Sequence, residues 1–98
     1  MIDVQQADEK AIFSGALTRA TITRAFDKKY RQLVNNDRIV IDLAMVSQID
    51  TAGLAWILLL IELAASKGCD ISLVNLPEDL LKLAKLSAVD TLLPIKNT

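Results

Sequence analysis

Two apolar, β-branched runs separated by one long apolar helix constrain the fold of this chain more than any other feature. Residues 38–46 (RIVIDLAMV) and 71–75 (ISLVN) are apolar along most of their length, which is the pattern of strands buried on both faces. Between them, Thr51 to Lys67 is predicted to form a helix, which Gly68 would end as its C′ residue. Strand, helix and strand in this order predict a parallel pair joined by a right-handed crossover.

The N-terminal third supplies further elements for such a sheet. Short strands are predicted at residues 2–4 and 11–13. A helix is predicted to follow, with Thr18 as a plausible N-cap. The apolar face of this helix consists of residues spaced by four, four and three positions: Ile22, Phe26, Tyr30 and Leu33.

The C-terminal third is predicted to contain one more helix and an apolar tail. Pro77 suits the first helical position, and the helix should reach about Leu86. The tail covers residues 91–95. We therefore expect one α/β domain over residues 1–98, with a mixed, mostly parallel sheet and helices mainly on one face.

Composition narrows the classes of function. The net charge of −1 argues against general affinity for nucleic acid or anionic lipid. The chain has no histidine, the commonest general base and metal ligand, and its single cysteine excludes an internal disulfide. Cys69 is expected to be a small core residue, with a reactive thiol as the alternative.

The location is expected to be cytoplasmic. The first residues contain neither a basic region nor an apolar region of a secretory signal. The longest charge-free apolar run, residues 51–61, is shorter than the roughly 18 residues that a membrane span requires. We therefore expect a soluble protein.

The predicted helix at residues 51–67 is apolar on more sides than packing on a sheet requires. A buried stripe can be formed by Leu54, Ile57, Leu58, Ile61 and Ala65. The opposite side then contains Ala52, Ala55, Leu59, Glu62 and Ser66, with Trp56 near its edge. Small and apolar residues on an outward side indicate a surface that binds another protein. Alternatively, the C-terminal tail covers this side.

Asp50 and Thr51 lie where this helix begins. The side-chain oxygen of either residue can cap the helix by accepting a backbone N–H. The same position, with Gly53 beside it, would also tolerate a phosphate on Thr51, because free N–H groups and the positive end of the helix dipole lie there.

A buried strand that leads through Asp50-Thr51-Ala52-Gly53-Leu54 into an apolar helix resembles the signature of the STAS domain. This is the fold of anti-sigma factor antagonists and of regulatory domains associated with transporters. The resemblance covers essentially the whole chain. Within the family, the segment DTAGLAWILLLIELAASKG and the later LAKL are most similar to the small STAS subunits of Mla phospholipid transport systems.

The resemblance implies a cytoplasmic, non-catalytic subunit in Gram-negative bacteria. Such a subunit binds the ATPase of an ABC transporter, within a complex that also contains permease and lipid-binding subunits, and supports its assembly and activity. The complex moves phospholipids between the inner and outer membranes and maintains lipid asymmetry of the outer membrane. The protein would be peripheral to the inner membrane through its partner. The expected centre of the ATPase contact consists of Thr51, Ala52, Ala55, Trp56 and Leu59.

Two other functions are open to this chain. In an anti-sigma factor antagonist, Thr51 would be the phosphoacceptor of an anti-sigma kinase, although serine is more usual in that role. In an enzyme, Asp42 and Asp50 would be the acidic residues near strand ends, but no cofactor or metal site is expected. Asp42 lies within an apolar strand and is more simply a hydrogen-bonded structural carboxylate.

Residues 19–38 are rich in basic side chains. The acidic residues in this stretch are Asp27 and Asp37, against six basic ones: Arg19, Arg24, Lys28, Lys29, Arg31 and Arg38. Such a run is typical of the solvated side of an amphipathic helix. A surface for membrane or nucleic acid is the alternative.

Overall fold

The computed structural model describes residues 1–96 and contains one four-stranded sheet. The strands lie in the order β1 (Ile2–Ala7), β2 (Lys10–Leu17), β3 (Arg38–Ile49) and β4 (Asp70–Val74). β1 is antiparallel to β2, whereas β2, β3 and β4 are parallel to one another. The predicted mixed, mostly parallel sheet is therefore confirmed. The predicted domain also includes residues 97 and 98, which lie outside the described part of the chain.

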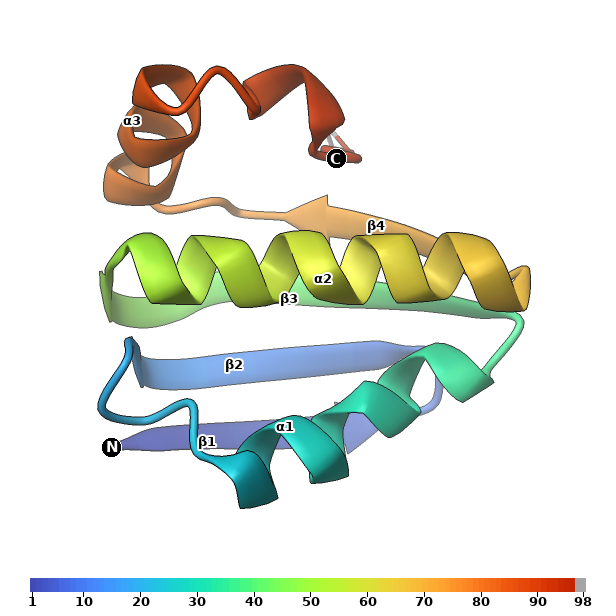
Figure 1. Cartoon of the computed structure of the whole chain (residues 1–98). Helices are drawn as coiled ribbons and strands as arrows, with labels where there is room; N and C mark the ends of the chain where they lie inside the picture. Colours follow the sequence, from blue (N-terminus) through green and yellow to red (C-terminus); the bar gives the residue numbers. More distant parts are fainter. Residues whose placement is uncertain (97–98) are drawn as a thin grey trace.

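The helices are α1 (Arg24–Tyr30), α2 (Thr51–Lys67) and α3 (Glu78–Leu86), and two short 3₁₀ helices, η1 (Arg31–Asn35) and η2 (Asp90–Leu92), follow α1 and α3. α1 and α2 lie over the same face of the sheet, and α3 lies beyond the β4 edge (Figure 1). Gly68 ends α2 at φ 72°, the left-handed conformation that the sequence predicts for it.

The core lies between the sheet and the helices α1 and α2. Its fully buried side chains on the sheet include Phe13, Leu17, Ile39, Ile41 and Leu43. Cys69 is also buried, as predicted for a small core residue. Burial and the nearby carboxylates of Asp70 and Asp37 raise the pKa of its thiol. Both effects disfavour the thiolate, which is the reactive form of cysteine.

Three of the four strands are longer than predicted, because they continue into polar residues at a sheet edge or past a register shift, whereas β4 has the predicted length and begins one residue earlier. β1 extends through Gln5 and Gln6, whose side chains are exposed on an edge strand. β3 gains extra residues where its pairing with β2 shifts register, between Ile12 and Ser14 and between Gly15 and Ala16. These shifts carry β3 on to Ile49, directly before α2.

The prediction of Thr18 as the N-cap of the first helix is wrong. Residues 18–22 form a turn instead, in which the Ile22 N–H donates to the Thr18 carbonyl over 2.9 Å. The cap is Thr23, whose hydroxyl oxygen accepts from the Phe26 N–H at 3.1 Å. Along residues 1–96, no helix is both long and apolar enough to cross a membrane.

Candidate functional site

Asp50 organises the start of α2. Its backbone is extended, and its Oδ1 accepts from the Gly53 N–H at 2.9 Å as the N-cap of the helix. Its Oδ2 accepts from the Arg19 N–H at 3.0 Å, which holds the loop after β2 against the end of β3. Hydrogen bonds from the backbone of Arg19 and Gly53 lower the pKa of Asp50. The cap is therefore Asp50 and not Thr51, the other candidate from the sequence.

Gly53 allows α2 to begin close to the sheet. A Cβ atom at this position would lie 2.1 Å from the Leu17 carbonyl oxygen and 2.9 Å from Ile49 Cγ1. Because the first of these atoms belongs to the backbone, a larger residue would push the first turn of α2 away from β2. Asp50 and Gly53 together fix the position of the first turn of α2 and thereby determine which of its residues face outward.

The outward side of the first two turns of α2 is small and apolar. Thr51, Ala55 and Leu59 are exposed and Ala52 is half-buried; we call these four residues the α2 face. The side chain of Leu59 is the large apolar group of this face, and 42% of its surface is exposed. The Thr51 hydroxyl forms no hydrogen bond with any residue in the range 1–96.

Trp56, which is predicted to lie near the edge of this side and in the centre of the ATPase contact, is buried. It is 5% exposed, and its ring packs 5.0 Å from Phe26 and 5.9 Å from Phe13 between centroids. Its indole Nε1–H donates to Asp27 Oδ1 over 2.9 Å. α1 packs against this side of α2 and therefore buries it. The centre of a docking surface would therefore consist of the α2 face without Trp56.

The buried stripe of α2 lies closer to α1 on the helix surface than the sequence predicts. Leu54 and Ile57 are buried as predicted, whereas Leu58 and Ile61 are half-buried and Ala65 is exposed. The buried set also includes Gly53, Trp56, Leu60 and Ala64. The sequence predicts the sheet contact of α2 but not the second contact with α1 and η1.

The C-terminal tail does not cover the α2 face. Ile95 forms a parallel bridge with Leu73, next to β4. The Leu73 N–H donates to the Pro94 carbonyl, and the Lys96 N–H donates to the Leu73 carbonyl, both over 2.9 Å. The tail thus extends the sheet beyond β4 and leaves the outward side of α2 exposed.

Asp42 has the structural role predicted for it. The residue is 8% exposed, and its Oδ1 accepts from the Ala44 N–H at 3.0 Å and from Asn75 Nδ2 at 3.1 Å. Lys10 Nζ lies 3.4 Å from its Oδ2. Burial alone raises the pKa of Asp42, but these partners outweigh burial and leave the pKa lowered. Among residues 1–96, no group of three or more His, Cys, Asp or Glu side chains could hold a metal ion.

Sequence reasoning missed the role of Asp27, which forms an ion pair with Arg31 and joins α1 to α2 through Trp56. Arg31 Nε donates to both oxygens of Asp27 at 2.9 Å, and Oδ1 of the same carboxylate accepts the Trp56 indole N–H. The i,i+4 spacing of Asp27 and Arg31 was a visible signal for the ion pair. The contact with Trp56 could not be read from the sequence, because it depends on how α1 crosses α2.

Comparisons with known proteins agree with this fold. A family model described as "Mlab, STAS domain" matches residues 3–94. The structure is similar to that of an anti-sigma factor antagonist from Mycobacterium paratuberculosis, with a TM-score of 0.75, 20% identity, and 100% of this chain and 86% of that chain covered. It is also similar to the unphosphorylated form of the anti-sigma factor antagonist SpoIIAA, with a TM-score of 0.72, 12% identity, and coverage of 99% and 89%.

Among curated protein sequences, none matches this chain significantly. The structural likenesses, at such low identity, show the fold alone. The family model covers nearly all of the chain and includes Asp50, Gly53 and the whole α2 face. The chain belongs to the MlaB-type STAS domain family.

Proposed function

We propose that this protein is the non-catalytic STAS subunit of an ABC transporter that moves phospholipids between the inner and outer membranes. In this role it binds the ATPase subunit, within a complex of permease and lipid-binding subunits, and supports ATPase assembly and activity. It acts in the cytoplasm of a Gram-negative bacterium and reaches the inner membrane only through its partner. The observation that carries the proposal is the match to the MlaB STAS model over residues 3–94.

The α2 face provides the surface that such a role requires. Ala52 and Ala55 permit close approach of a partner backbone, and Leu59 offers an apolar group for a pocket. The Thr51 hydroxyl can donate to or accept from a polar group of the ATPase. Asp50 caps the start of α2, and Trp56 is buried against α1, so neither belongs to the α2 face.

An anti-sigma factor antagonist is the second candidate. It is favoured by the similarity in fold to two anti-sigma factor antagonists. In this function an anti-sigma kinase transfers the terminal phosphoryl group of ATP to the Thr51 hydroxyl, which loses its proton, and ADP leaves. The exposed hydroxyl at the start of α2 is accessible to such a kinase. The β-methyl group of threonine hinders this attack more than serine would.

Copurification separates the two functions. The protein is tagged at its N-terminus and expressed in its own host, either as wild type or as Thr51→Glu. Glutamate at the first helical position interacts favourably with the helix dipole, so the variant should fold. We expect wild type to recover an ABC ATPase, and Thr51→Glu to lose it, because charge and bulk disturb the α2 face.

Thr91→Glu is the matched control, since Thr91 is also exposed but lies in η2. This variant should recover the ATPase as wild type does. Recovery of an anti-sigma kinase in place of the ATPase would replace the transporter function by transcriptional control. Equal recovery of the ATPase by a folded Thr51→Glu protein would remove Thr51 from the contact.

A further inference from the structure

Positive charge is concentrated in one short part of this chain. Residues 19–31 contain five of the 11 Lys and Arg residues and a single acidic residue, Asp27, in a chain whose net charge is −1. The rest of the protein is therefore clearly acidic. A basic segment on an acidic protein attracts an acidic partner to that segment, while the acidic remainder of the surface repels it.

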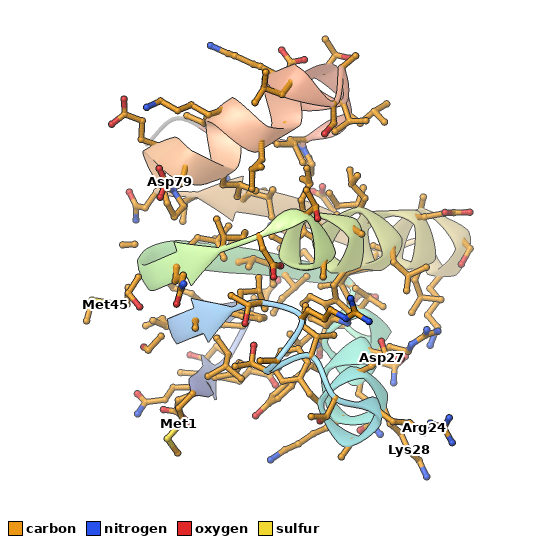
Figure 2. The ribbon with its side chains drawn as sticks, turned by 60° about the vertical axis from the view of Figure 1, so that its left-hand side comes forward. Met1, Arg24, Asp27, Lys28, Met45 and Asp79 are labelled. Atoms are coloured by element: carbon orange, nitrogen blue, oxygen red, sulfur yellow. The ribbon has the colours of Figure 1, made fainter. Side chains whose placement is uncertain are left out.

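The cations of α1 form a row. Arg24, Lys28 and Arg31 are spaced by four and three positions, so they lie along one side of the helix and its 3₁₀ continuation; we call them the basic row. All three are exposed. Arg24 and Lys28 point away from the core (Figure 2). Arg31 also contacts Asp27, which leaves Arg24 and Lys28 as the stronger candidates for binding an external anion.

The basic row runs beside the α2 face and in the same direction. Asp27 of α1 contacts Trp56, and further along the chain Lys67 Nζ contacts the Asn35 side chain, so α1 with η1 runs parallel to α2. Arg31 and Leu59 line one shallow hollow between these elements, together with Glu62, Leu63 and Ser66. At Arg31 and Leu59 the basic row thus meets the α2 face.

We propose that the basic row is part of the docking surface and binds acidic side chains of the partner. The partner would present an apolar group to the α2 face, flanked on the α1 side by carboxylates that meet Arg24 and Lys28. This inference rests on the proposed function and adds the chemistry of the ATPase segment to it. The basic row determines orientation and association rate, while the α2 face provides the apolar contact.

A protein partner fits this surface better than a membrane does. Lipid-binding surfaces combine several free cations with large apolar or aromatic groups that enter the bilayer. On the α2 face, Thr51, Ala52 and Ala55 are too small to insert, and Leu59 is a single large apolar group, 42% exposed. The net charge of −1 also opposes attraction to an anionic bilayer.

Charge reversal tests the proposal with the purified ATPase subunit of the phospholipid ABC transporter from the same organism. Binding is measured by surface plasmon resonance at two salt concentrations for Arg24→Glu/Lys28→Glu. The control, Lys85→Glu/Lys96→Glu, makes the same change in net charge at two exposed residues of α3 and the tail. Thermal unfolding of each variant confirms that it is folded.

We expect the basic-row variant to bind about tenfold more weakly at low salt, mainly through slower association, and the control to bind as wild type does. The deficit should shrink at high salt, because salt screens exposed charges. Two results would remove the basic row from the docking surface but keep the transporter function. One is an equal loss of ATPase binding in the basic-row variant and the control. The other is no loss in either while Leu59→Arg abolishes binding. Absence of ATPase binding by wild type would contradict the proposed function itself.

Cosedimentation with vesicles tests the alternative that the basic row binds a membrane. Wild type and the basic-row variant are sedimented with vesicles of phosphatidylglycerol and phosphatidylethanolamine. We expect both to remain in the supernatant. Sedimentation of wild type alone, without an effect of the variant on ATPase binding, would assign the basic row to a membrane and overturn the proposal.

Discussion

The helices α2 and α3 differ in the residues on the sides that face away from the core. The outer side of α3 is mostly charged: Leu80 and Ala84 are buried, Glu78, Asp79, Lys82 and Lys85 are exposed, and its exposed leucine, Leu86, is the last residue of the helix. Asp79 projects from the start of this helix in Figure 2. α2 buries Leu54, Ile57 and Leu60 in the same way, but its outward side begins with Thr51, Ala55 and Leu59.

The docking surface that we propose on α2 accounts for this difference. Packing against the rest of the protein explains the inner side of both helices, and contact with water explains the charged outer side of α3. Neither explains why the first turns of α2 lack charged residues on the outside. A protein–protein contact does explain it, because charged groups are depleted at the centres of interfaces.

The largest expected effect on stability comes from a comparison of the inner and outer sides of α2. Leu60→Ala removes a side chain that is 3% exposed and should lower the free energy of unfolding by about 2–5 kcal/mol. Leu59→Ala, one residue earlier, should change it by less than about 0.5 kcal/mol. Urea denaturation measures both. Similar losses would mean that the outward side of α2 is packed and cannot be free for docking.

A smaller effect tests how the start of α2 is held. Gly53→Ala places a Cβ against the Leu17 carbonyl and should lower the free energy of unfolding by about 1–3 kcal/mol. Gly68→Ala, at the other end of the helix, has open space around its Cβ and costs only backbone strain, about 1 kcal/mol. Urea denaturation of both variants gives the ranking. A smaller loss for Gly53→Ala would show that α2 does not approach β2 so closely.

The smallest effect concerns the contact between α1 and α2. The Arg31 guanidinium, followed by the Trp56 indole, lowers the pKa of Asp27 against the opposing effect of burial. The ionised carboxylate therefore stabilises the fold above the ordinary carboxyl range near pH 4, and this contribution disappears as the pH falls through the lowered pKa. At neutral pH, Asp27→Asn should lower the free energy of unfolding by about 0.5–1 kcal/mol.

Trp56 is the only tryptophan and reports this contact by its fluorescence. The difference between wild type and Asp27→Asn should vanish at a pH below the pKa of Asp27. Asp3→Asn, an exposed residue of β1, is the control and should change neither stability nor fluorescence. A difference that persists in acid would show that shape, not charge, holds α1 against α2.

The sequence predicts elements well where a single local signal dominates. The bounds of α2 follow from Asp50 as one of two possible caps, from an uninterrupted apolar segment and from Gly68. The end of β3 could not be predicted, because register shifts with β2 break the apolar pattern before Ser47 and Gln48. The N-cap of α1 was missed because Thr18 and Thr23 are chemically equivalent candidates, and only the turn between them selects Thr23.

The candidate site follows the same rule. Thr51, Ala52, Ala55 and Leu59 could be placed on one side of α2 from helical spacing alone, and the structure brings them together there. Trp56 could not, because its burial depends on α1, whose position no local pattern encodes. Arg24 and Lys28 carried a signal of charge, but their place beside α2 also depends on that tertiary contact.

The affinity of the ATPase subunit for two leucine variants tests most directly whether the α2 face is the docking surface. Leu59→Arg and Leu86→Arg make the same substitution at exposed leucines, one on the α2 face and the other at the end of α3. We expect Leu59→Arg to weaken binding by roughly 30-fold or more, as at the centre of an interface, and Leu86→Arg to leave it unchanged. Wild-type affinity in a folded Leu59→Arg protein, or an equal loss in Leu86→Arg, would contradict docking through α2.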